Sequence, residues 1–208
     1  MIVRAQLTVM TTSILESRIV LPTDIGANLA YIQSADGVPP SGALSFLHRV
    51  RSDVGKRAAA AYPEQFAQLR EAYLRAEPSI AAAYEQWSRS KEISTVVRIP
   101  SSRCDAAPFL SAILRGNPQA RDLSEFFTKD SDWSAGGSPH FAFSDAMTKI
   151  RWQGIEPHHS KTLVIVDESL NQGTSAAIVV RHLESAGVTY DALWLVAPLV
   201  LRDLSAAL

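Results

Sequence analysis

The chain has 208 residues, of which 47% are hydrophobic, and a formal net charge of −1. This length favours one domain, or one domain with an appendage, and the apolar content is enough for a sizeable core. The balanced charge excludes a global basic field, which argues against a nucleic-acid partner but leaves a local basic patch open. No apolar run approaches the roughly 20 residues that span a bilayer, so we expect no membrane partner either.

The single cysteine, Cys104, limits the redox and metal chemistry of the chain. It cannot form an internal disulfide, and it has no second cysteine for a thiolate metal site. This usage fits a reducing, cytoplasmic compartment. Cys104 fits two roles, a small residue near the start of a helix or a catalytic thiol.

Residues 1–92 are expected to be mostly helical. Apolar side chains recur at helical spacing within 41–51 and 58–77, and residues 79–89 form another candidate helix. Pro78 predicts a break between the last two. We therefore expect a helical hood or dimerisation segment, with a homodimer as one possible assembly.

Residues 93–208 are expected to form an α/β core. The segment 94–99 is rich in β-branched residues and nearly continuous in apolar content, which is typical of a strand buried on both faces, and 162–166 and 192–197 are predicted as two further strands of this kind. Helices are expected at 105–114 and at about 175–186. The order strand, helix, strand indicates right-handed βαβ connections in a parallel sheet.

The region between these elements is expected to contain a mobile loop and a further helix. The loop covers Ser131–Phe143, with Gly136 and Gly137 as flexible points. His140 within it fits a proton donor or a phosphate contact as well as a solvated side chain. The helix is predicted near residues 144–152.

Two consecutive acids, Asp167 and Glu168, follow the predicted strand 162–166. In an open parallel sheet, ligands bind beyond the carboxyl ends of the strands. Alternation sends the two side chains to different sides of the strand, so they can hold two parts of one ligand. Carboxylates accept hydrogen bonds from a diol, and Mg²⁺ favours oxygen ligands. The pair is therefore a candidate site for sugar hydroxyls and a magnesium ion.

The next residues, Asn171, Gln172, Gly173, Thr174 and Ser175, open the predicted helix. A helix start presents free backbone N–H groups, and its dipole favours an anion. Glycine permits a positive φ, and the two hydroxyls add donors. Two acids followed by this cradle fit a 5-phosphoribosyl group. The same residues also fit an acidic strand end followed by an ordinary capped helix, and spacing alone does not decide between the two.

The run Val-Ile-Val-Asp-Glu-Ser-Leu-Asn-Gln-Gly-Thr-Ser, residues 164–175, resembles the PRPP-binding signature of type I phosphoribosyltransferases, where PRPP is phosphoribosyl pyrophosphate. The closest form of that signature is that of glutamine amidophosphoribosyltransferases. The resemblance implies that Asp167 and Glu168 bind the ribose hydroxyls, directly or around Mg²⁺, and that residues 171–175 enclose the 5-phosphate. Three positions differ: Glu168 stands where Asp is commoner, and Asn171 and Gln172 replace an aliphatic residue and Arg.

A second segment, residues 96–103, resembles the strand and loop that hold pyrophosphate in the same family. Ser101, Ser102 and Arg103 supply donors for a polyanion, and an arginine suits bidentate phosphate contacts. The alternative is a capped helix entry with a solvated Arg103. In the family, a mobile loop follows this motif, and Ser131–Phe143 is its counterpart by the resemblance.

The resemblance implies an α/β fold with a parallel-sheet, phosphoribosyltransferase-like core at 93–208 and a helical N-terminal hood or appendage at 1–92. It implies transfer of 5-phosphoribosyl from PRPP to a nitrogen acceptor, a nucleobase or an amine, with release of pyrophosphate and Mg²⁺ as cofactor. Asp167, Glu168 and Arg103 are then the catalytic residues.

Two other functions remain open at this point. A regulatory protein of the same fold would bind PRPP or a nucleoside monophosphate without turnover. An interaction protein would instead use the N-terminal half as its working surface, and the pocket would be vestigial.

Overall fold

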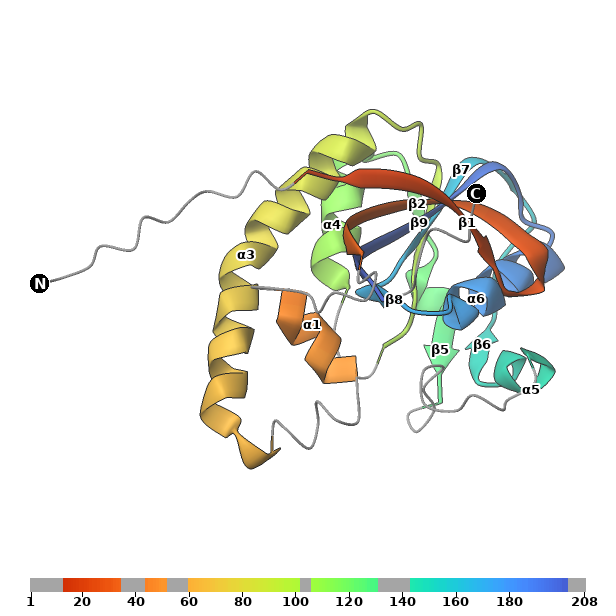
Figure 1. Ribbon diagram of the computed structural model, residues 1–208. Helices are drawn as coiled ribbons and strands as arrows, with labels where there is room; N and C mark the ends of the chain where they lie inside the picture. The colour runs from red at the N-terminus through yellow and green to blue at the C-terminus, as the bar shows by residue number, and fades with distance from the viewer. Residues whose placement is uncertain (1–12, 35–43, 52–59, 102–105, 131–142, 202–208) are drawn as a thin grey trace, which may run out of the picture.

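The computed structural model describes residues 13–34, 44–51, 60–101, 106–130 and 143–201, and within them the central feature is a seven-stranded sheet (Figure 1). The strand order is β1-β2-β9-β7-β3-β4, and the short β8 also pairs with β9. The strands are β1 (Leu15–Leu21), β2 (Ile25–Ser34), β3 (Thr95–Arg98), β4 (Arg121–Asp122), β7 (His159–Val166), β8 (Ser169–Leu170) and β9 (Thr189–Val200). From β2 to β4 all neighbours run parallel, and β1 is antiparallel at one edge. The predicted α/β class with a parallel sheet is confirmed.

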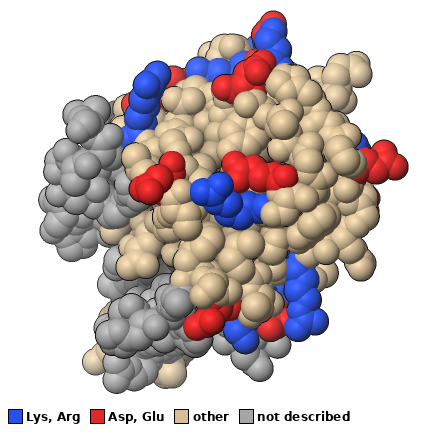
Figure 2. All heavy atoms as spheres, turned by 90° about the vertical axis from the view of Figure 1, so that its right-hand side faces the viewer, with Lys and Arg blue, Asp and Glu red and all other residues tan. Residues whose placement is uncertain are grey.

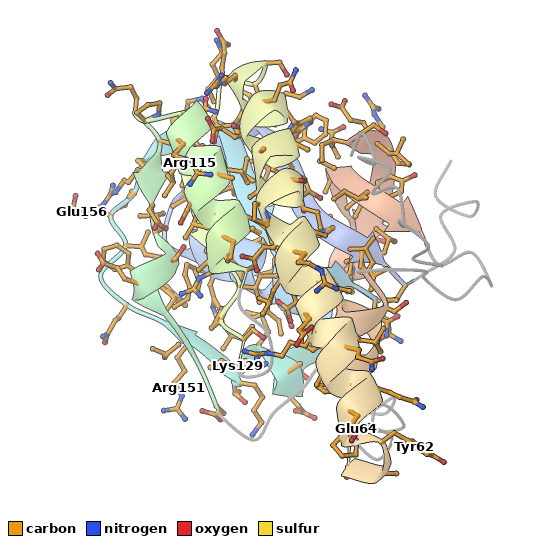
Figure 3. The ribbon with its side chains drawn as sticks, turned by 90° about the vertical axis from the view of Figure 1, so that its left-hand side faces the viewer. Tyr62, Glu64, Arg115, Lys129, Arg151 and Glu156 are labelled. Carbon is orange, nitrogen blue, oxygen red and sulfur yellow. The ribbon has the colours of Figure 1, made fainter. Side chains whose placement is uncertain are left out.

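Helices cover both faces of this sheet. One face packs against α1 (Leu44–Arg51), α3 (Pro63–Arg89) and α4 (Ala107–Gly116), and the other against α6 (Thr174–Ser185). Figure 3 shows α3 and α4 side by side over the first face, with Tyr62 and Glu64 at the start of α3, beyond α4. Within the described ranges, no helix is both long and apolar enough to cross a membrane.

A small antiparallel pair flanks α6. It consists of β5 (Phe127–Lys129) and β6 (Ile150–Trp152), with α5 (Phe143–Met147) before β6. The predicted helix near 144–152 is therefore wrong beyond Met147. Ile150 is β-branched and fully buried in the core on the α6 side, so the end of this segment pairs with β5 instead of continuing the helix.

Alternate residues of the central strands are buried in two separate hydrophobic cores, one on each face of the sheet. Val164 and Val166 of β7 pack on the side of α3 and α4, whereas Leu163 and Ile165 pack on the side of α6. All four are essentially inaccessible to solvent, and burying each such side chain contributes about 1.5–3 kcal/mol. The prediction of strands buried on both faces is confirmed.

The predicted helical N-terminal segment is wrong for residues 15–34, which form the β1–β2 hairpin. Strand β2 runs parallel to β9, in the same sheet as the strands of residues 93–208. Ile25, Ala27 and Leu29 are buried on the α6 side, a period of two that packs a strand and not a helix.

The remaining helices of this segment agree with the prediction, except at Pro78. This residue lies inside α3, which continues through it. A proline removes the hydrogen bond to the carbonyl four residues earlier, here that of Leu74. Both Leu74 and Pro78 lie on the exposed side of α3, where water can bind that carbonyl.

A cluster of charged and aromatic side chains ties the hairpin to α3 and β9. Oε1 of Glu16 in β1 accepts a hydrogen bond of 2.8 Å from the Trp87 indole and lies 2.9 Å from Nζ of Lys91. The same ammonium lies 4.4 Å from the ring centroid of Trp194 in β9. Burial raises the pKa of Glu16, but the hydrogen bonds from Lys91 and Trp87 outweigh it, so the pKa is lowered overall.

We predict that Glu16→Gln lowers the free energy of unfolding by about 1 kcal/mol at pH 7, because the ion pair is partly exposed. A carboxyl with a lowered folded-state pKa contributes its stability above its ordinary pKa of 4.5, and this contribution is lost as the pH falls through the folded value. The difference between variant and wild type should therefore shrink by pH 3, as measured by urea unfolding.

The control is Glu92→Gln, which removes the partner of Lys161 in a more exposed ion pair. It should change stability less than Glu16→Gln does. Equal stability of wild type and Glu16→Gln at pH 7 would contradict the role of the cluster.

Candidate functional site

Asp167 and Glu168 directly follow β7 in the middle of the sheet, between β3 and β9. Because these strands are parallel, their carboxyl ends lie at one edge, where ligands bind in such sheets. Arg98 of β3 is in register with Val166, and Ile99 N–H donates to the Val166 carbonyl at 2.9 Å. The loop after β3 and the two acids after β7 therefore start side by side.

The sheet ladder is interrupted where the two acids leave β7. Asp167 N–H still donates to the Val196 carbonyl at 2.9 Å, and pairing with β9 resumes at Ser169. Pro198, which has no N–H to donate, lies in β9 between Val196 and Leu199, where the pairing of β9 passes from β7 to β8.

Both carboxylates are withdrawn from water. Asp167 is 5% exposed and Glu168 is 0% exposed. Oδ1 of Asp167 accepts from the Glu168 N–H at 2.8 Å, and Oε1 of Glu168 accepts from the Ser101 hydroxyl at 3.1 Å. Burial of a carboxylate is costly unless such donors replace water. The Ser101 contact joins the two sequence motifs, which lie 67 residues apart in the chain.

Of the three residues predicted to hold pyrophosphate, the structure therefore places Ser101 beside Glu168. Ser102 and Arg103 lie outside the described residues, as does Cys104. The predicted mobile loop Ser131–Phe143 also lies outside them, apart from Phe143, which begins α5. The ligand roles of these residues stay predictions.

The predicted 5-phosphate segment leads into α6 as expected. Gly173 is the N-cap residue and has the left-handed conformation, with φ 79° and ψ 13°. Thr174 is the first helical residue, and Thr174 and Ser175 are half-buried, while Asn171 and Gln172 are exposed. The predicted helix start is confirmed.

The beginning of α6 has the features of an anion site. The first N–H groups of an α-helix have no acceptor within the helix, and the helix dipole adds a partial positive charge there. Gly173 supplies no side-chain cap, and the first turn of α6 contains no acidic residue. An incoming phosphate would therefore meet free donors and no neighbouring carboxylate of this turn.

One side of Gly173 is packed against apolar side chains. A Cβ at this position would lie 2.6 Å from Cδ2 of Leu21 and 3.3 Å from Cδ1 of Leu170. Sequence reasoning found neither Leu21 nor Pro198. Pro198 could have been found from the sequence, since a proline inside a buried strand indicates an interruption of the hydrogen-bond ladder. Leu21 gave none, because its contact with Gly173 spans most of the chain.

Asp167 and Glu168 are the residues at the sheet edge that could hold a divalent cation, and no group of three or more metal-binding side chains occurs among the residues that the structure describes. Mg²⁺ is commonly bound through one or two carboxylates with substrate phosphates and water completing the shell.

The surface on the α6 side has mixed charge. Figure 2 shows acidic and basic side chains interspersed on this face, with no broad area of one sign. Capture of an anionic ligand here would depend on local donors and not on a surface field.

Comparisons with known proteins find a likeness among solved structures but none among family models or curated proteins. No protein-family model matches the sequence, and no curated protein matches it. Among solved structures, the chain is similar to an orotate phosphoribosyltransferase from Aeropyrum pernix, with 14% identity and a TM-score of 0.35. That alignment covers 88% of this chain and 74% of the other. A TM-score of this size does not establish a shared fold.

We predict that Gly173→Ala destabilises the protein by about 1–2 kcal/mol, because a Cβ is unfavourable at this positive φ and would press on Leu21. Gly26→Ala is the matched control, since a Cβ there meets no atom within 4 Å. Urea unfolding should show a loss for the first variant and none for the second. Equal stabilities would mean that the left-handed turn is not required.

Proposed function

We propose that this protein binds PRPP at the carboxyl edge of its sheet and transfers the 5-phosphoribosyl group to a nitrogen acceptor, a nucleobase or an amine. The observation that carries the proposal is the Asp167–Glu168 pair, linked to Ser101 and followed by a left-handed glycine at the start of α6. Two carboxylates, a hydroxyl donor and a helix start thus lie along one edge of the sheet.

Each part of PRPP has a counterpart in this arrangement. The first-turn N–H groups of α6, with the hydroxyls of Thr174 and Ser175, would bind the 5-phosphate. Asp167 and Glu168 would accept hydrogen bonds from the ribose hydroxyls, and Ser101, Ser102 and Arg103 would bind the pyrophosphate. The Ser101–Glu168 contact supports this assignment, because it joins a residue assigned to the sugar and a residue assigned to the pyrophosphate.

The reaction breaks the bond from C1 of the ribose to the pyrophosphate oxygen and forms a bond from C1 to the acceptor nitrogen, whose proton passes to the pyrophosphate or to solvent. Positive charge develops on the sugar and negative charge on the leaving group. Asp167 and Glu168 would orient the ribose, and Arg103 would stabilise the departing pyrophosphate. Mg²⁺, when bound, would neutralise charge on the pyrophosphate.

A second function, a PRPP or nucleotide sensor without turnover, is favoured by one observation. Glu168 is fully buried and already accepts a hydrogen bond from Ser101, so it reaches a ligand only if the pair rearranges. A steady-state assay of pyrophosphate release across nucleobases and amines separates the two functions. Release with one acceptor supports the enzyme, and binding without release for every acceptor supports the sensor.

We predict that the double variant Asp167→Asn, Glu168→Gln abolishes PRPP binding while the protein stays folded, because the amides keep the shape but lose the negative charge. The expected loss is about 100-fold or more in affinity, since hydrogen bonds to charged groups contribute about 1.5–3 kcal/mol each. Calorimetry with PRPP and Mg²⁺ measures it, and circular dichroism checks the fold.

Asp191→Asn is the control, because Asp191 is an exposed acid near the start of β9, paired with His159. It should leave PRPP affinity unchanged. If the double variant bound PRPP as wild type does, the assigned site would be wrong.

A further inference from the structure

The turn of the N-terminal hairpin is fastened to α6. Arg181 of α6 donates from Nε to the Thr23 hydroxyl at 3.1 Å and from Nη2 to the Thr23 carbonyl at 2.8 Å. Its third nitrogen, Nη1, pairs with Glu184 at 2.7 Å on the same helix. Figure 1 shows the turn between β1 and β2 lying beside α6.

The fastened turn has an unusual backbone. Thr23 and Asp24 have φ values of 64° and 59°, in the left-handed region that L side chains rarely adopt. Such a conformation persists only when surrounding contacts hold it. The two bonds from Arg181 to Thr23 are contacts of this kind. The hairpin therefore has a fixed position relative to α6.

Leu21, the last residue of β1, connects this turn to the start of α6. Its side chain is 2% exposed and occupies the space where a side chain at Gly173 would lie. The three nearest heavy atoms to that position belong to Leu21 and Leu170. Asn171 and Gln172, which precede Gly173, are exposed. Part of the packing beneath Gly173 thus comes from β1, near the N-terminal end of the described chain.

We infer that Leu21 is a positioning residue for the phosphate end of the ligand site. It packs beneath Gly173 and keeps the left-handed turn in place, so the first N–H groups of α6 are aligned before a ligand binds. The conformational freedom of the turn that would otherwise be lost when the ligand binds is then already restricted by the fold. This inference rests on the proposed function, because it assigns the 5-phosphate to the start of α6.

A positioning role at this place acts on one end of the ligand. Leu21 contacts the turn before α6, whereas Ser101 and Glu168 form a separate hydrogen bond at the end of β3. Loss of the Leu21 side chain should therefore weaken ligands that carry a 5-phosphate and spare those that bind only through the pyrophosphate loop. A general loss of stability would weaken both.

The test is Leu21→Ala in the full chain, with ribose 5-phosphate and magnesium pyrophosphate as separate calorimetric probes. We expect about tenfold weaker binding of ribose 5-phosphate, since small misplacements of binding groups have effects of this order or larger. Pyrophosphate affinity should stay within about twofold, because the loop after β3 is untouched. Leu21→Met, in which the new side chain has a similar volume, should bind ribose 5-phosphate with the affinity of the wild type.

Ile19→Ala is the matched control, because Ile19 is buried on the same face of β1 and is not near Gly173. It should lower the melting temperature as Leu21→Ala does and leave both ligand affinities unchanged. Should Leu21→Ala not fold, the smaller change Leu21→Val is expected to weaken ribose 5-phosphate binding alone, by less than tenfold.

The outcomes separate this inference from the proposed function. If the wild-type protein binds neither probe, the proposed function fails. If wild type binds both and the Leu21 variants bind ribose 5-phosphate as well as Ile19→Ala does, the positioning role is overturned while the function stands. Equal losses for both probes in the Leu21 variants also overturn it, because they report a general loss of structure.

Discussion

The structure depends on the removal of two adjacent carboxylates, Asp167 and Glu168, from water at the carboxyl edge of a parallel sheet. Such burial is unfavourable unless donors replace the lost water. The Glu168 N–H and the Ser101 hydroxyl supply two of these donors, and Ser101 is available because β3 lies next to β7. The strand order is therefore tied to the site, since another neighbour of β7 would bring a different loop to these acids.

Two further features adjoin the same edge, Pro198 in β9 and the β1–β2 hairpin. Pro198, which has no N–H to donate, lies in the long central strand β9 where its pairing passes from β7 to β8. The β1–β2 hairpin extends the sheet on the far side of β9 and packs beneath Gly173. An N-terminal element expected to be a separate helical hood thus supports the loop that opens α6. The polar edge is built on two apolar cores, one on each face of the sheet.

The core strands could be predicted from sequence because their signal is local. Residues 94–99, 162–166 and 192–197 are mainly apolar runs, and the start of α6 is marked by Gly173 followed by a helical pattern. The hairpin at 15–34 was missed because the composition rich in Ala, Arg and Glu at residues 57–92 was extended to the whole of 1–92, while the period of two in the hairpin covers only a few buried positions. The sequence predicted that the segments around Ser101 and Glu168 bind one ligand, but it did not predict the hydrogen bond between these two side chains. The contact of Leu21 with Gly173 has no local signal at all.

A crystal structure of the protein soaked with a nucleoside 5′-monophosphate tests the central claim most directly. The account predicts phosphate oxygens within hydrogen-bond distance of the backbone N–H groups that open α6, with the ribose hydroxyls at Asp167 and Glu168. A nucleotide bound elsewhere, with both acids still buried and the start of α6 free of phosphate, would contradict it.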